Sequence, residues 1–337
     1  MFSQIFKSSP HGNVGLNTNQ VMRIVCYATI PGLLTQMYFY GWGVLIQVIL
    51  CILVALLSEA AILSLREKSV RVTLSDGSAV LTGLLLALSI PALAPWWISV
   101  IGVAFAVIIV KQLYGGLGYN LFTPAMAGYV VLLISFPVAM TSWLPAQQLM
   151  MYSLTFSDAV YLIFTGFSVD GYNMVQLKTL VDGVSMATPL DQFKPGLAQQ
   201  HTATEILSLP IYGQYGGFAS QYISMAYILG GLYLIHRGVI RWHIPVAFVL
   251  SLFVFSLFAM AITPDNTYPA TFHLLTGATM FGAFFIATDP VSASTTVKGR
   301  LIFGAFIGFL VFIIRQWGGY PDGVAFAVLL ANMCVPL

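Results

Sequence analysis

Residues 83–91 read GLLLALSIP and residues 282–290 read GAFFIATDP, two short apolar runs that each begin with glycine and end with proline. A hydrophobic stretch follows each run and leads to a double glycine, Gly115-Gly116 in the first half and Gly318-Gly319 in the second. Another apolar stretch follows each double glycine. The shared order predicts an internal repeat; the alternative is chance similarity, since glycine and proline also punctuate unrelated membrane helices.

Apolar residues dominate the whole chain. Hydrophobic residues make up 58% of the 337 residues and charged residues only 7%, whereas soluble domains carry about 25% charged residues. This length has room for about ten membrane spans of about 20 residues each. The net charge of +2 is small, and the basic residues form no stripe, so no nucleic-acid partner is expected. The composition predicts a multi-pass membrane protein.

The apolar stretches predict helices, because a lone membrane segment can satisfy its backbone hydrogen bonds only as a helix. The third and ninth predicted spans have only about 14 residues, which is short for a bilayer, so we expect each to be tilted or broken. The expected spans lie near residues 22–40, 43–63, 78–91, 96–110, 122–140, 220–236, 243–262, 270–288, 301–314 and 320–336.

Five predicted spans precede the polar stretch 141–219 and five follow it. Because the number in each half is odd, the second repeat enters the membrane from the opposite face. Inverted repeats of this kind are typical of transporters. The predicted fold is an all-α polytopic membrane protein with about ten transmembrane helices. Its domains are two inverted five-helix repeats, residues 1–140 and 220–337, and the extracytoplasmic loop 141–219 between them.

Lysine and arginine predict the orientation, because they are enriched in the cytoplasmic loops of membrane proteins. With the N-terminus in the cytoplasm, only Lys178, Lys194 and Arg315 fall outside. Ten basic residues then fall on or near the cytoplasmic side: Lys7, Arg23, Arg66, Lys68, Arg71, Lys111, Arg237, Arg241, Lys298 and Arg300. Both termini are therefore predicted to be cytoplasmic, and the 141–219 loop periplasmic.

Three ionisable residues fall within or at the ends of predicted spans, where an unpaired charge is costly. Glu59 could bind a coupling cation or carry a proton, but we expect an interfacial carboxylate near Arg66. Asp289 is expected to cap a helix end rather than to line an ion path. His273 has no obvious partner within the membrane, so a haem held by two histidines is not expected.

The cysteines and glycine-rich stretches exclude several cofactor classes. Cys26, Cys51 and Cys334 are far apart and form no CxxC motif, so this chain is not expected to hold an iron–sulfur cluster, a structural zinc or a disulfide framework. Glycine-rich stretches such as 212–217 follow no strand of a βαβ unit, and no P-loop is present. Direct binding of NADH or ATP is therefore not expected.

The polar stretch contains a run of small and hydroxylated residues, DGVSMATP at 182–189. On its chemistry alone this run predicts a turn, because an unactivated threonine is a poor nucleophile. The order of Asp182, Ser185, Ala187 and Thr188 nevertheless resembles the motif at which a flavin transferase attaches FMN to threonine through a phosphoester. Met186 stands where that motif usually has glycine.

Further segments carry a resemblance to one family. They are residues 8–11 (SSPH), 75–79 (SDGSA) with 81–88 (LTGLLLAL), and 118–125 (GYNLFTPA). Together with the attachment motif, they make the chain similar over essentially its full length to the D subunit of the Rnf ion-translocating electron-transport complex. The B subunit of the sodium-translocating NADH:quinone reductase is a more distant match.

The resemblance implies that Thr188 carries covalent FMN within the motif formed with Asp182, Ser185 and Ala187. A flavin transferase would then be a maturation partner. An anionic phosphodiester is costly in hydrocarbon, so a polar loop is a suitable place for it.

The resemblance also implies a second, non-covalent flavin, riboflavin, between the helices. It does not assign the contacts of this flavin; Lys111, Asn120 and Thr123 are candidates because they lie near the Gly115-Gly116 turn. The implied function is a flavin-carrying subunit of a translocase in the bacterial inner membrane, where electron transfer between ferredoxin and NAD(H) is coupled to Na⁺ or H⁺ movement. Other subunits would supply the iron–sulfur clusters, further flavin and the NADH site. The alternatives are a small-solute channel or transporter that uses the repeat interface, and a structural anchor for redox partners.

Overall fold

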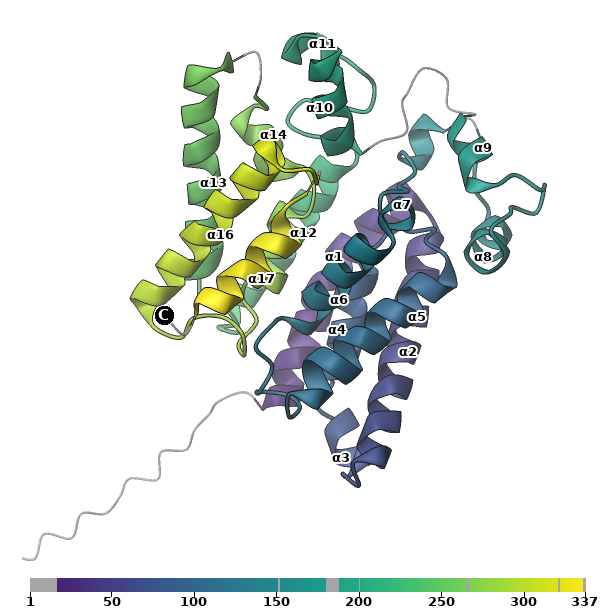
Figure 1. Cartoon of the computed structure of the whole chain (residues 1–337), viewed down its shortest axis with the longest axis vertical. Helices are drawn as coiled ribbons and strands as arrows, with labels where there is room; N and C mark the ends of the chain where they lie inside the picture. The colour runs from purple at the N-terminus through teal and green to yellow at the C-terminus, as the bar shows by residue number, and fades with distance from the viewer. Residues whose placement is uncertain are drawn as a thin grey trace, which may run out of the picture.

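The computed structural model describes residues 17–150, 152–179, 188–199, 201–264, 267–320 and 322–335. In these ranges the regular structure is helical, accompanied by two isolated β-bridges, Phe167 with Asn173 and Tyr212 with Gly217. Figure 1 shows two groups of long helices with shorter helices at one end. The prediction of an all-α polytopic membrane protein is confirmed.

The first half contains seven α-helices and one π-helical segment that cross or flank the bundle. They are α1 (Thr18–Tyr40), α2 (Gly43–Leu65), α3 (Val70–Leu74), α4 (Ser78–Ala87), α5 (Trp96–Ala104) with its π-helical continuation η1 (Phe105–Leu113), α6 (Pro124–Ser135) and the short α7 (Pro137–Met140).

The second half has a similar order, except that its π-helical segment continues the short α15 rather than a long helix. It contains α12 (Ser220–His236), α13 (His243–Ile262), α14 (Ala270–Leu275), α15 (Thr279–Phe281) with the π-helical η4 (Gly282–Ile286), α16 (Val297–Trp317) and α17 (Val324–Cys334). The stretch between the halves contains η2 (Gln147–Leu149), α8 (Phe156–Thr165), α9 (Met174–Thr179), α10 (Pro189–Ala198) and α11 (Ala203–Leu207).

Four segments of the described chain are long and apolar enough to cross a membrane: α2, α5 with η1, α13 and α16. They form two matched pairs in the repeat order. The prediction of a short third span agrees with α4, which has 10 residues, but the short ninth span is wrong because α16 has 21 residues. The predicted span 270–288 is instead the broken one, since the helix stops at Leu275 and Gly277 has a φ of +69° before α15 begins.

The helices α1 and α12 pack closely at the boundary between the halves and run in opposite directions. The last turns of α1 and the first turns of α12 line one cavity, whereas the first turns of α1 and the end of α12 line another. Glycines permit this close packing: a Cβ on Gly230 would lie 2.1 Å from the backbone oxygen of Ala28. Small residues bring membrane helices together in the same way generally.

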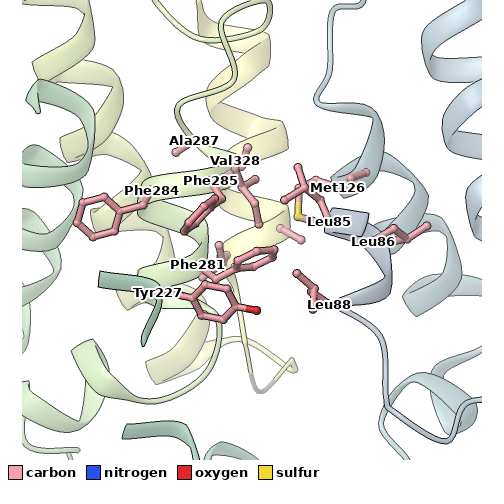
Figure 2. Close-up of a cluster of buried hydrophobic side chains, with 14 of the residues drawn as sticks. Leu85, Leu86, Leu88, Met126, Tyr227, Phe281, Phe284, Phe285, Ala287 and Val328 are labelled. Atoms are coloured by element: carbon pink, nitrogen blue, oxygen red, sulfur yellow. The ribbon is translucent and has the colours of Figure 1, made fainter. Parts of the chain in front are cut away.

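One hydrophobic core joins the two halves. Figure 2 shows Leu85, Leu88 and Met126 from the first half facing Tyr227 and Phe281 from the second. The polar stretch adds two smaller cores of its own. Leu154, Leu162 and Ile163 of α8 and its preceding segment pack with Leu93 of the first half.

The second of these smaller cores joins α10 and α11 to the second half. Leu190 and Phe193 pack with Tyr268 and Phe272, which lie just before and within α14. The polar stretch is therefore structured in two parts, one on each half of the bundle, as Figure 1 shows for α8–α9 and α10–α11. Residues 180–187 between the two parts lie outside the described residues.

Candidate functional site

A cavity of about 160 Å³ lies between the two halves, at the end of the bundle that carries the polar stretch; we call it the loop-side cavity. Its walls are rich in aromatic side chains, which come from α1, α6, α12 and α15 and from the segment that follows α7. The aromatic residues are Tyr40, Tyr129, Trp143, Tyr227 and Phe281. Ligand cavities commonly have this character, with a mainly apolar lining and a few placed polar groups.

Thr188 lines the loop-side cavity and is the N-cap residue of α10. Its hydroxyl donates to Asp191 Oδ2 at 2.7 Å, and the Asp191 backbone N–H donates to the Thr188 hydroxyl at 3.2 Å. This reciprocal arrangement satisfies backbone groups at the start of a helix that have no partner within it. Pro189 follows as the first helical residue, a position for which its fixed φ is suited.

Two tyrosines hold the first turn of α10 against the second half. The hydroxyl of Tyr212 donates to the carbonyl of Pro189 at 3.0 Å, and that of Tyr268 donates to the carbonyl of Leu190 at 2.9 Å. The ring of Phe193 stacks on Tyr268 with 3.8 Å between centroids. A tyrosine hydroxyl is protonated at neutral pH, and burial raises the pKa of Tyr212 further, so this hydroxyl is a donor. These contacts fix the position of Thr188 relative to the cavity.

A buried ion pair stands behind the cavity wall. Arg315 has none of its side-chain surface exposed, and its Nη2 lies 3.0 Å from Oδ1 of Asp322, which lines the cavity. The same guanidinium donates to the carbonyls of His273 and Thr276, where α14 stops. The free carbonyls at a helix end carry partial negative charge, so the broken helix helps to stabilise the buried cation.

A second cavity, of about 300 Å³, lies at the opposite end of the bundle; we call it the far-side cavity. Lys111, Asn120 and Thr123, the three candidate contacts for a second flavin, are all buried and all line it. Thr123 and Ser292 exchange a hydrogen bond of 2.9 Å. Among the described residues, Oδ1 of Asn120 has no hydrogen-bond partner although it is buried.

Lys111 is held by groups from two other helices. Its Nζ donates to Oε1 of Glu59 and to the hydroxyl of Ser78, at 2.6 Å in both cases, and Gln112 donates to the same Glu59 oxygen at 2.6 Å. The expectation of an interfacial Glu59 near Arg66 is therefore wrong, because Glu59 is fully buried and paired with Lys111. Separated by 52 residues in sequence, the two charges meet only through the packing of α2 against η1.

The two cavities occupy equivalent places in the repeat. Gly77 precedes α4 with a φ of +77°, and Gly277 precedes α15 with a φ of +69°. Ser78 lines the far-side cavity and Ala278 lines the loop-side cavity, directly after these glycines. The starts of α4 and α15 are thus each beside one cavity, and inversion of the repeat places the cavities at opposite ends.

Two basic residues differ from their expected roles, whereas Asp289 agrees with its own. Lys111 and Arg315 are buried, so they are not loop charges. Without Lys111 the predicted cytoplasmic side keeps nine basic residues, and without Arg315 the outer side keeps two. Asp289 closes a local turn by accepting from the backbone and hydroxyl of Ser292, as a terminal cap would. The ring nitrogens of His273 have no hydrogen-bond partner among the described residues.

Of the attachment motif, Thr188 is described, whereas Asp182, Ser185 and Ala187, with Met186, lie outside the described residues. Asp191 was missed although its spacing from Thr188, three residues, is that of a capping box. Other site residues missed from the sequence, Asp322 and Tyr227 among them, carried no local signal, because they reach the cavity only through the packing of α17 and α12 against the rest of the bundle.

Comparison with known proteins places this arrangement in a family. The profile of the NQR2, RnfD, RnfE family matches residues 5–337. The D subunit of an ion-translocating oxidoreductase complex from Aliivibrio salmonicida is 58% identical over 330 residues, which cover 98% of this chain and 94% of that protein. The D subunit of the complex of the same name from Cronobacter sakazakii is 56% identical and is covered to 95% of its length. These matches across nearly the whole chain show that the protein belongs to the NQR2, RnfD, RnfE family.

Proposed function

We propose that this chain is the flavin-carrying membrane subunit of a complex that couples electron transfer between ferredoxin and NAD(H) to the movement of Na⁺ or H⁺. The names of its relatives support redox-driven ion translocation by a multisubunit complex. The observation that carries the flavin assignment is the placement of Thr188. Its hydroxyl stands at the wall of an aromatic-lined cavity between the two halves, where a cofactor tethered to it could reach both.

The residues of the loop-side cavity fit covalently attached FMN. The phosphoester would lie at the N-terminus of α10, where the helix dipole stabilises negative charge. Asp191 and Asp322 also line the cavity, but Arg315 neutralises Asp322. The aromatic walls suit a flat ring system. Bound there, FMN would supply chemistry that links one-electron and two-electron transfer.

The chain's own contribution is to position the cofactor and to control its surroundings. The contacts of Tyr212 and Tyr268 with α10 fix the point of attachment. Esterification of Thr188 removes the proton that its hydroxyl donates to Asp191, so the capping box of α10 must rearrange in the mature protein. A tether keeps the local cofactor concentration high, and the apolar walls exclude water from the ring.

The far-side cavity is the proposed site of the second, non-covalent flavin, riboflavin. Asn120 supplies a buried acceptor that has no partner among the described residues, and Thr123 supplies a hydroxyl. Lys111 supplies a cation that Glu59 neutralises. Because the two cavities are equivalents in an inverted repeat, the arrangement would place one flavin near each face of the membrane.

The orientation that we propose has both termini in the cytoplasm and residues 141–219 in the periplasm, with the chain in a bacterial inner membrane. Apart from Lys111 and Arg315, nine basic residues fall on the cytoplasmic side in this orientation and two fall outside, which supports it. A flavin transferase would attach FMN at Thr188, with Asp182, Ser185 and Ala187 completing its recognition motif. Partner subunits would carry the iron–sulfur clusters, further flavin and the NADH site.

In-gel fluorescence of the denatured protein, expressed together with its transferase, tests the flavin assignment. We expect a fluorescent wild-type band and a dark Thr188→Ala band. Thr202→Ala is the matched control, because Thr202 caps α11 through the same kind of box with Glu205. It loses an equivalent cap in the same stretch but should remain fluorescent. A dark wild-type band would contradict the proposal and favour a transporter that uses the two cavities for a solute.

A further inference from the structure

Tyr227 carries a hydroxyl that the protein buries without pairing it. Its side chain, on α12, is 1% exposed. Among the described residues, none forms a hydrogen bond with the Tyr227 hydroxyl. A buried polar group is normally hydrogen-bonded, and one without a partner destabilises the fold. The hydroxyl therefore requires a partner from outside the described chain.

The ring of Tyr227 is fixed on several sides. Its centroid lies 4.8 Å from that of Phe281 and 5.7 Å from that of Phe285. Gly32 of α1 makes room for the ring, since a Cβ at that position would lie 2.2 Å from a ring carbon of Tyr227. A side chain held this tightly cannot turn its hydroxyl to another partner, so the direction of the hydroxyl is a built feature of the fold.

That direction is toward Leu88, a residue that also lines the loop-side cavity (Figure 2). Tyr227 lines the cavity together with Leu88, which comes from the other half of the repeat. Figure 2 shows the tyrosine oxygen directed toward Leu88, with the ring beside Phe281. Thr188 lines the same cavity. The side chain with the orphaned hydroxyl and the proposed attachment point therefore line one shared cavity.

We propose that the Tyr227 hydroxyl donates a hydrogen bond to the ring system of the flavin held in the loop-side cavity, and so positions the ring and tunes its redox potential. The inference rests on the proposed function. The edge of a flavin ring carries carbonyl oxygens and ring nitrogens that accept hydrogen bonds. A donor at such an atom draws electron density from the ring and makes reduction easier, which is one of the ways in which proteins tune a cofactor.

The variant Tyr227→Phe removes only the hydroxyl. In spectroelectrochemical titration of the purified, flavin-carrying chain, we expect the midpoint potential of the covalent flavin to become more negative. A tenfold change in the equilibrium between oxidised and reduced flavin corresponds to about 30 mV for a two-electron couple. The matched control is Tyr222→Phe, since Tyr222 lies on the same helix, is 50% exposed and does not line the cavity. Its potential should equal that of the wild type.

Thermal unfolding provides a second measurement. The change in melting temperature caused by Tyr227→Phe should have opposite signs in the flavin-free and the flavin-carrying chain. In the flavin-free Thr188→Ala chain, Tyr227→Phe should raise the melting temperature, because it removes an unpaired buried hydroxyl. In the flavin-carrying chain it should lower the melting temperature, because it removes a hydrogen bond. The assignment of Tyr227 would be overturned if Tyr227→Phe shifted the melting temperature in the same direction in both chains and had the same midpoint potential as Tyr222→Phe. A wild-type chain without flavin would instead overturn the proposed function itself.

Discussion

Lys111 and Arg315 are equivalent positions of the repeat, and each is a fully buried cation paired with a carboxylate at opposite ends of the bundle. Lys111 pairs with Glu59 of α2, whereas Arg315 pairs with Asp322, seven residues further along its own chain segment. Both halves therefore bury a cation at this position, but its carboxylate partner comes from a different part of each half. The first pair lies beside the start of α4 and the far-side cavity, and the second lies beside the end of α14 and the loop-side cavity.

The pair of Lys111 and Glu59 should show strong coupling in a double-mutant cycle. Removal of one partner of a buried pair leaves an uncompensated charge and typically costs about 3–5 kcal/mol. We therefore expect Lys111→Met and Glu59→Gln to destabilise the protein strongly when introduced alone, and the double variant to be more stable than either. Thermal unfolding in detergent measures the three effects. Additive effects would contradict a direct pairing of the two charges.

The crossing of α1 and α12 should depend on Gly230. A Cβ there would meet the backbone oxygen of Ala28 at 2.1 Å, so Gly230→Ala forces the helices apart. Overpacking of this kind typically costs about 1–3 kcal/mol, and we expect a lower melting temperature and a lower yield of folded protein. Gly319→Ala is the control, because a Cβ at Gly319 meets nothing within 4 Å. Equal effects of the two substitutions would argue against the close crossing.

Asp158 should make the first part of the polar stretch sensitive to acid. Burial alone would raise the pKa of Asp158. Hydrogen bonds from Thr155, Val169 and Tyr152 together lower it by more than burial raises it, so the pKa lies below the ordinary value of 3.8. A lowered folded-state pKa stabilises the fold above that value, and the contribution is lost as the pH falls through the folded pKa. Asp158→Asn lacks the contribution at every pH.

Limited proteolysis measures this difference. At pH 7, chymotrypsin should cleave Asp158→Asn between residues 152 and 179 faster than it cleaves the wild type. At a pH well below 3.8, pepsin should cleave both at similar rates. Asp170→Asn is the control, because among the hydrogen bonds of the described residues Asp170 accepts only from the exposed Tyr152 hydroxyl. A wild type as sensitive as the variant at pH 7 would contradict a stabilising Asp158.

The proposed orientation can be tested with single cysteines in a chain whose Cys26, Cys51 and Cys334 are replaced by alanine. A cysteine at the exposed Gln199 should react with a membrane-impermeant thiol reagent added to intact cells. A cysteine at the exposed Arg241, at the other end of the bundle, should react only after lysis. The reverse pattern would invert the orientation and place Thr188 in the cytoplasm.

Hydrophobic pattern was enough to predict most of the helical segments, because membrane helices need long apolar runs. It did not reveal the break between α14 and α15. At this break Gly277 adopts a positive φ, and Arg315 binds the carbonyls that the break exposes. The contact with Arg315 could not be read locally, because Arg315 is distant in sequence. Apolarity alone also predicted too short a span for α16, because Lys298 and Arg300 lie within its first turn.

The polar stretch 141–219 was expected to be a loop, yet three of its helices start with readable capping boxes. Thr155, Thr188 and Thr202 each stand three residues before an acidic residue and each caps a helix. Local chemistry could thus have located α8, α10 and α11. It could not have shown that α10 docks on Tyr268 or that Thr188 faces a cavity, because both depend on the packing of distant segments.

Intact-protein mass spectrometry of the chain from its native membrane tests the central claim most directly. If Thr188 carries FMN, the wild-type mass exceeds the sequence mass by that of one FMN less one water, and fragmentation places the addition on the peptide that contains Thr188. Thr188→Ala should have its bare sequence mass, and Thr202→Ala should keep the addition. An unmodified wild-type chain, or an addition that survives in Thr188→Ala, would contradict the account.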